Sequence, residues 1–155
     1  MSNPDPDEGP GIDLPSAAPT LHLARRLAHE LADVASVEIN KMDRGLSVTI
    51  TPNNAQARSF GWVDFPEEVI LHVGEVGGRW ELGSGPDDMT FLAAVARSVV
   101  AGHVREVFAR GRSVVSVMLA DGSIETETGY EGLVGCLPLP FWRRWSKSIQ
   151  YAPYR

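Results

Sequence analysis

An amphipathic helix is predicted near the start of the chain by apolar residues that recur at helical spacing. Thr20 can cap this helix, which continues to about Val34. Leu23, Leu27 and Leu31 fall on one side of it, whereas histidines, arginines and an aspartate recur on the other side. One face of the helix is therefore expected to lie on the core and the other in water.

A second helix is predicted to begin at Pro86 and to end at Gly102. Its apolar face is wide, because Leu92 and its valine neighbours are flanked by Phe91 and several alanines. We therefore expect this helix to lie on a sheet. The next residues, 103–109, keep helical spacing but also suit a strand. Because Gly102 interrupts the helix, we favour the strand and keep the helix as the alternative.

Alternation of apolar and polar residues predicts strands in much of the remaining chain. The clearest run, from Val114 to Leu119, is followed by Asp121-Gly122, which is typical of a two-residue hairpin turn. Strands are expected at residues 37–40, 46–51, 60–65, 69–73, 79–82, 103–109, 114–119 and 124–128. The predicted fold class is α+β, with an antiparallel meander of about seven to eight strands and two main helices packed on one face.

The overall composition is that of a globular protein. Changes in composition along the 155 residues divide the chain into three parts. Residues 1–19 are acidic and rich in proline, so we expect them to be disordered. Residues 20–140 are expected to form a single α+β domain. Residues 141–155 are expected to be an aromatic and basic C-terminal segment that docks on this domain.

The chain is expected to be cytoplasmic. It contains no run of about 18 apolar residues, so no transmembrane segment is predicted. Its first residues lack the basic and apolar regions of a signal peptide. Cys136 is the single cysteine, so an intrachain disulfide is excluded. We expect its small side chain to be packed in the fold rather than to act as a nucleophile.

The net charge of −6 argues against nucleic acid as a partner and is compatible with a protein partner. The two ends of the chain carry opposite charges. Residues 1–13 contain four acidic residues and no basic one, whereas residues 141–155 contain four basic residues and no acidic one. The ends cancel each other, so the body of the chain keeps the negative charge.

Catalytic, metal-binding and cofactor-binding patterns do not stand out in the sequence, so neither a metal nor a cofactor is predicted. His22 and His29 lie seven residues apart on one helix face, and a metal site would need closer spacing and a third ligand. The remaining candidates for a polar site are Asp64, His72 and Glu81, which belong to the first group of predicted strands.

Aromatic and cationic residues alternate at the start of the C-terminal segment. Trp142, Arg143, Arg144 and Trp145 are the candidates for contact with a partner, because such mixtures suit protein interfaces, anionic membranes and single-stranded nucleic acid. The favoured interpretation is structural: both tryptophans pack on the sheet and both arginines meet the acidic body. A protein-binding surface is the next alternative.

Several short motifs resemble those of small actinobacterial single-domain proteins of unassigned function. The resemblance covers roughly residues 60–155, and the motifs are Gly78-Arg-Trp-Glu-Leu82, Gly111-Arg-Ser-Val-Val115, Asp121-Gly122, Gly135-Cys-Leu-Pro-Leu-Pro140 and Tyr151-Ala-Pro-Tyr-Arg155. In its size, acidity and α+β character the chain is also similar to immunity proteins of bacterial toxin systems. That similarity assigns no role to any residue.

Two functions are compatible with these features. The first is a non-enzymatic cytosolic binding protein, in particular an immunity-like inhibitor whose acidic body masks a basic partner protein. The alternative is a small enzyme or ligand-binding domain, with a polar site that the first group of strands assembles from Asp64, His72 and Glu81. A buried pocket joining at least two ionisable groups would favour the alternative, whereas a shallow, acidic face without a pocket would favour the binding protein.

Overall fold

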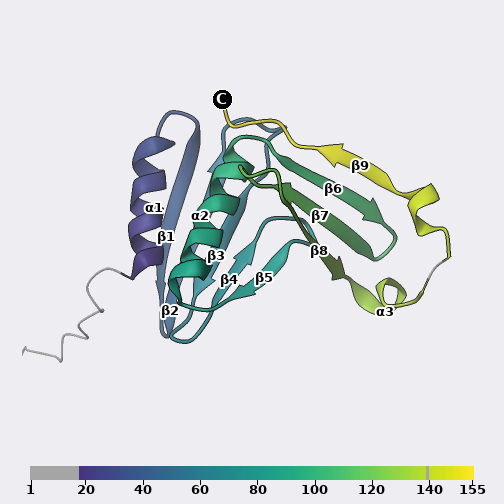
Figure 1. Ribbon diagram of the computed structural model, residues 1–155, viewed down its shortest axis with the longest axis horizontal. Coiled ribbons are helices and arrows are strands. Elements are labelled where there is room, and N and C mark those ends of the chain that lie inside the picture. Colours follow the sequence, from purple (N-terminus) through teal and green to yellow (C-terminus); the bar gives the residue numbers. More distant parts are fainter. Residues whose placement is uncertain (1–17, 139) are drawn as a thin grey trace, which may run out of the picture.

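Nine strands form two antiparallel sheets in the residues that the computed structural model describes, 18–138 and 140–155 (Figure 1). The first sheet follows chain order, with strands β1 (Ala35–Met42), β2 (Gly45–Pro52), β3 (Phe60–Asp64), β4 (Val69–His72) and β5 (Arg79–Leu82). The second sheet has the order β8-β7-β6-β9, with strands β6 (Val104–Ala109), β7 (Arg112–Met118), β8 (Ile124–Tyr130) and β9 (Lys147–Gln150).

The α+β class is confirmed, whereas the predicted meander of seven to eight strands is only partly right. The described strands are nine, and they form two sheets of five and four rather than one continuous meander. Residues 103–109 contain strand β6, so the helical alternative is wrong. The unexpected strand is β9, which pairs with β6 and lies at the edge of the second sheet. Its one large apolar residue is Ile149, so its sequence has no strand-like alternation.

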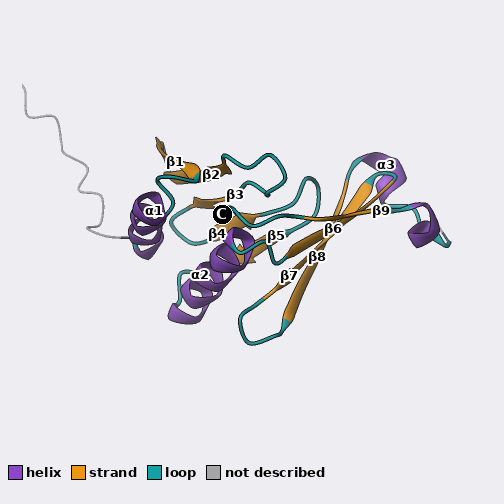
Figure 2. Ribbon diagram, turned by 90° about the horizontal axis from the view of Figure 1, so that it is seen from above, coloured by secondary structure: helices purple, strands orange, loops and turns teal. Residues whose placement is uncertain are grey.

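Two long helices cover the same face of the first sheet, as Figures 1 and 2 show from two directions. Helix α2 (Pro86–Val100) begins after Gly85, as predicted, and carries two aspartates in its first turn. Helix α1 (Pro19–Glu30) begins one residue before Thr20, so the predicted cap is wrong. Thr20 lies inside the first turn, is buried, and donates its hydroxyl proton to Asp64.

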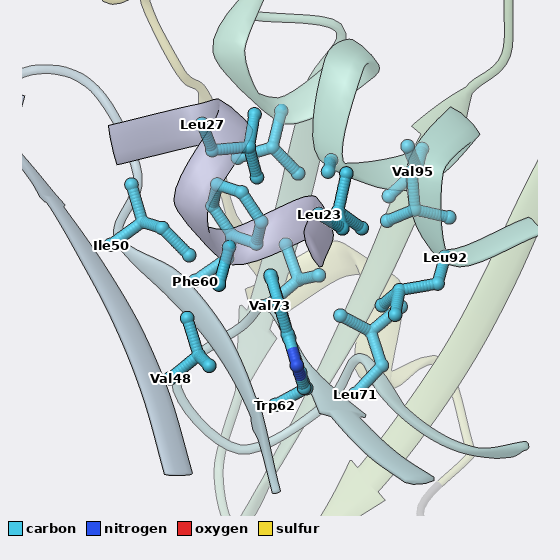
Figure 3. Packing of buried hydrophobic residues seen from close by; sticks show 14 of the residues in the cluster. Leu23, Leu27, Val48, Ile50, Phe60, Trp62, Leu71, Val73, Leu92 and Val95 are labelled. Carbon is cyan, nitrogen blue, oxygen red and sulfur yellow. The ribbon is translucent and has the colours of Figure 1, made fainter. Parts of the chain in front are cut away.

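One hydrophobic core lies between these helices and the two sheets (Figure 3). Strands β2 and β3 contribute side chains in register, because Val48 pairs with Trp62 and Ile50 pairs with Phe60. Helix α2 reaches both sheets, since it also contacts β7. The residues labelled in Figure 3 are Leu23, Leu27, Val48, Ile50, Phe60, Trp62, Leu71, Val73, Leu92 and Val95.

A buried carboxylate joins the two sheets. Glu106, on β6, has no exposed surface. Its Oε1 accepts hydrogen bonds from the Ser113 hydroxyl, at 2.7 Å, and from the backbone N–H of Glu75, at 2.8 Å. Its Oε2 accepts one from the Tyr151 hydroxyl, at 2.7 Å. The Ser113 Oγ in turn accepts the N–H of Gly77, at 2.6 Å. The loop between β4 and β5 is thereby bound to the second sheet.

Close backbone packing and a second network support this joint. A Cβ atom on Gly129 would overlap the carbonyl oxygen of Val76, so glycine is required where β8 meets the loop. Arg58 donates to the carbonyl oxygen of Val73 at 2.8 Å and lies over the ring of Tyr151. Burial raises the pKa of the Tyr151 hydroxyl well above its usual value, and the hydrogen bond to the glutamate raises it further.

The last residues of the chain return to the first sheet and the helices. Tyr154 is buried, its hydroxyl donates to the carbonyl oxygen of Arg58 at 2.7 Å, and its N–H donates to Val100 on α2 at 3.0 Å. Arg155 donates to the carbonyl oxygen of Glu30 at the end of α1, at 2.9 Å. The C-terminal residues therefore connect the second sheet to both helices. Of residues 1–19, predicted to be disordered, 1–17 lie outside the described part of the chain, whereas Pro19 is the first residue of α1.

The core position of α2 can be tested by truncating one leucine. Leu92→Ala is expected to lower the free energy of unfolding by about 2–5 kcal/mol, because Leu92 is fully buried and its loss leaves a cavity. Urea denaturation measures this change. Ile124→Ala, on an exposed edge strand, is the control and should change stability by no more than about 0.5 kcal/mol. Equal effects of the two substitutions would contradict the assigned core.

The joint between the sheets gives a second prediction. Glu106→Ala is expected to cost more than about 3 kcal/mol, because it leaves buried donors without their acceptor at about 1–3 kcal/mol each. Glu106→Gln keeps an acceptor oxygen and should lie between the alanine variant and wild type. Glu38→Ala removes an exposed glutamate on β1 and serves as the control in the same denaturation experiment. A Glu106→Ala protein as stable as this control would show that the joint is unimportant.

Candidate binding surface

Large hydrophobic side chains are exposed together at the far end of the second sheet. We call this surface the tip. Its members come from the end of β8 and from the segment that leads to β9, and their exposed fractions are 55% for Tyr130, 90% for Leu133, 53% for Leu137, 70% for Phe141 and 85% for Trp145. Single exposed apolar residues are common on proteins, but a cluster of this kind is typical of an interaction site.

Two short elements carry Leu133 and Trp145, the two most exposed members of the tip. Helix α3 (Gly132–Gly135) and the 3₁₀ turn η1 (Trp142–Trp145) both lie beyond the β6–β7 turn, away from the helices that cover the core (Figure 1). A Cβ atom on Gly135 would overlap the carbonyl oxygen of Gly111, so the backbone of α3 lies directly against the β6–β7 turn. The tip is thus attached to the sheet by backbone contacts, and its side chains remain free to face water.

Arg112 holds the parts of the tip together. Its guanidinium group donates to the carbonyl oxygens of Gly135, at 2.9 Å, and Leu137, at 2.6 Å. The same group lies 5.3 Å from the ring centroid of Tyr130 and 5.5 Å from that of Trp142. Both distances are within the range of cation–π attraction. One arginine on β7 therefore positions the end of β8, the α3 segment and η1.

The turn that presents η1 is unusual. Phe141 has a φ of 59°, in the left-handed region that residues other than glycine seldom adopt. Such conformations cost free energy and are concentrated at functional sites such as ligand clamps and switch regions. The ring of Phe141 lies 5.2 Å from the Arg144 guanidinium carbon, and the ring of Trp142 lies 5.6 Å from that of Arg143. The tip is therefore both aromatic and cationic.

The structure separates the four residues that the sequence grouped together. Trp142 is half-buried between arginines, but Trp145 is exposed, so the expectation that both tryptophans pack on the sheet is wrong for Trp145. Arg143 and Arg144 are exposed and, among the described residues, form no ion pair with the acidic body. The physical reason is that β9 joins the sheet only at residue 147, after η1 has passed beyond its end.

The predicted polar site is not assembled as one site. Asp64 pairs with Leu46 and Val69 on the face of the first sheet that the helices cover. His72 and Glu81 belong to the opposite face of that sheet, because their strand positions have the other parity. The sheet itself therefore lies between Asp64 and the other two residues.

On the open face of the first sheet, cations surround His72. A shallow hollow of about 390 Å³ beside Gly61 is lined by His72, Arg58 and Arg79. Partial burial lowers the pKa of His72, and the nearby positive charge of Arg58 lowers it further. Arg79 forms an ion pair with Glu81 at 3.2 Å. Within the described part of the chain, no three histidine, cysteine or acidic side chains gather as metal ligands.

The sequence analysis did not identify Tyr130, Leu133 and Leu137 as members of a binding surface. It also did not identify Arg112, which holds the parts of the tip together. A usable signal was present, because residues 129–141 contain many large apolar side chains between glycines and prolines but show neither helical nor strand period. Apolar residues without a period have no core face to occupy. Cys136, expected to be packed, belongs to the same segment and is also exposed.

The comparisons with known proteins add no relative to this picture. No helix in residues 18–138 or 140–155 is long and apolar enough to cross a membrane. No family model, curated protein or solved structure matches the chain. The resemblance to small actinobacterial proteins thus stays a prediction, and function must be inferred from the geometry of this chain alone.

Proposed function

We propose that this chain is a non-enzymatic binding protein that engages a partner protein through the tip. The observation that carries the proposal is the joint exposure of Phe141, Trp145 and Leu133, which are 70%, 85% and 90% exposed. Aromatic residues and arginines supply most hot spots of protein interfaces. Holding these side chains in water is unfavourable, and burial against a partner would recover that free energy.

The charge of the tip indicates the kind of partner. Arg143, Arg144 and Lys147 are exposed on or beside it, whereas residues 130–155 contain one acidic side chain, the exposed Glu131. A complementary partner has an apolar pocket with acidic residues at its rim, since opposite potentials speed encounter and select the correct partner. The net charge of −6 led us to expect a basic partner, whereas the surface that meets the tip would have to be acidic.

Inhibition of a toxin-like partner in the cytoplasm is the finer form of this proposal. It requires a partner that is basic where it meets the acidic body and acidic where it meets the tip. The alternative function was an enzyme or ligand-binding domain with one polar site made of Asp64, His72 and Glu81. It loses support because the sheet separates Asp64 from the other two residues.

Capture from a lysate of the source organism, followed by affinity measurement with the purified partner, tests the proposal. Phe141→Ser combined with Trp145→Ser is expected to weaken binding by at least about 30-fold, as the loss of interface hot spots does. Ile124→Ser is the matched control, because Ile124 is 63% exposed at the opposite end of the β7–β8 hairpin. Thermal melting checks that both variants fold.

Three results would overturn the proposal. The first is unchanged affinity of the Phe141→Ser/Trp145→Ser protein for its captured partner. The second is equal loss of binding in the Ile124→Ser control. The third is tip-dependent binding to vesicles of anionic lipid or to single-stranded nucleic acid without a protein partner, which would assign the aromatic and cationic side chains to a different class of ligand.

A further inference from the structure

A large apolar cavity opens beside the start of helix α1, far from the tip. Its volume is about 660 Å³, within the range of sites that bind small molecules. We call it the α1 cavity. The first turn of α1 forms one wall, and the residues after β3 form another. Apolar lining residues are Leu21, Ile39, Leu46, Phe65, Val69 and Met89.

Two basic residues and one acidic residue line the α1 cavity. Lys41, on β1, and Arg44, in the β1–β2 turn, line it and are exposed. Neither forms an ion pair within the described residues. The acidic side chain of the lining is Asp64, which already accepts a hydrogen bond from the buried hydroxyl of Thr20. Among the described residues, the two cations therefore have no acidic partner, whereas the carboxylate accepts a hydrogen bond.

We propose that the α1 cavity binds a long-chain carboxylate, with its alkyl chain inside and its head group at the cations. The apolar lining suits an alkyl chain, because each buried methylene gains transfer free energy. Lys41 and Arg44 complement the negative head group. Asp64 would repel that head group from the interior, so the ligand has one favoured orientation. This site is independent of the tip and of the proposed partner.

The chain-length dependence of binding is the first test. Titrations of the full-length protein with octanoate, laurate and palmitate, below the concentrations at which these form micelles, measure the dissociation constants by calorimetry. Affinity should rise by up to about fourfold per added methylene until the cavity is full. Dodecanol, which has the chain of laurate without its charge, should bind more weakly than laurate. Absence of saturable binding, or affinity independent of chain length, would overturn the proposal.

Variants locate the ligand. Lys41→Ser combined with Arg44→Ser should weaken laurate binding about tenfold and reduce its dependence on salt, because the head group loses both cations. Arg25→Ser combined with Arg97→Ser removes two exposed cations that do not line the cavity, and serves as the charge-matched control. Ile39→Trp puts a bulkier side chain on the cavity wall and should weaken laurate binding. Equal affinities in all three variants would place the ligand elsewhere.

The N-terminal residues are the competing occupant, because the chain enters the fold at Ala18, in the wall of the cavity. A full-length protein with Ile12→Ser and Leu14→Ser distinguishes the two cases. Unchanged affinity for laurate supports the proposed ligand. An increase of tenfold or more would show that the chain's own apolar residues compete for the cavity, and the assignment to a carboxylate would then fail.

Discussion

The buried carboxylate of Glu106 is the interaction on which the arrangement of the two sheets depends. A carboxyl group without partners would be costly in a protein interior. Here a serine hydroxyl, a backbone N–H and a tyrosine hydroxyl donate to it. These donors come from the loop after β4, from β7 and from the C-terminal residues. One side chain thus joins segments that are distant in the sequence, and the polar cost of burial is offset only when all of them are in place.

This joint explains how the protein can display apolar side chains and still have a stable core. The core fills the space between the helices and the near parts of both sheets, whereas the second sheet continues beyond it to the tip. The tip is fixed from below by Arg112 and by the pairing of β9 with β6. Its exposed aromatic rings make no contribution to the core, so a role in recognition is the physical reason we give for their presence.

Local patterns predicted most of the fold. Alternation along β2 and β7 and the wide apolar face of α2 report contacts made within each element, and all three were found where expected. Strand β9 was missed, because an edge strand held by backbone hydrogen bonds needs no apolar alternation. The Glu106 joint was also beyond prediction, since its partners lie 7, 31 and 45 residues away in the chain.

The candidate sites were predicted less well, for two reasons. Strand parity already separates Asp64 from His72 and Glu81, so their grouping could have been rejected from the sequence. The exposure of Trp145 could not be predicted in the same way, because hydrophobicity alone favours burial and only the three-dimensional path of η1 leaves this side chain 85% exposed.

Collisional quenching of Trp145 fluorescence by acrylamide tests the central claim, that the tip is displayed, most directly. The difference between wild type and Trp145→Phe isolates the emission of this residue from that of the other tryptophans. We expect quenching close to that of a tryptophan in an unfolded peptide, because Trp145 is 85% exposed. Protection as strong as that of Trp62, which is 1% exposed, would show that the side chain is packed and that the tip is no binding surface.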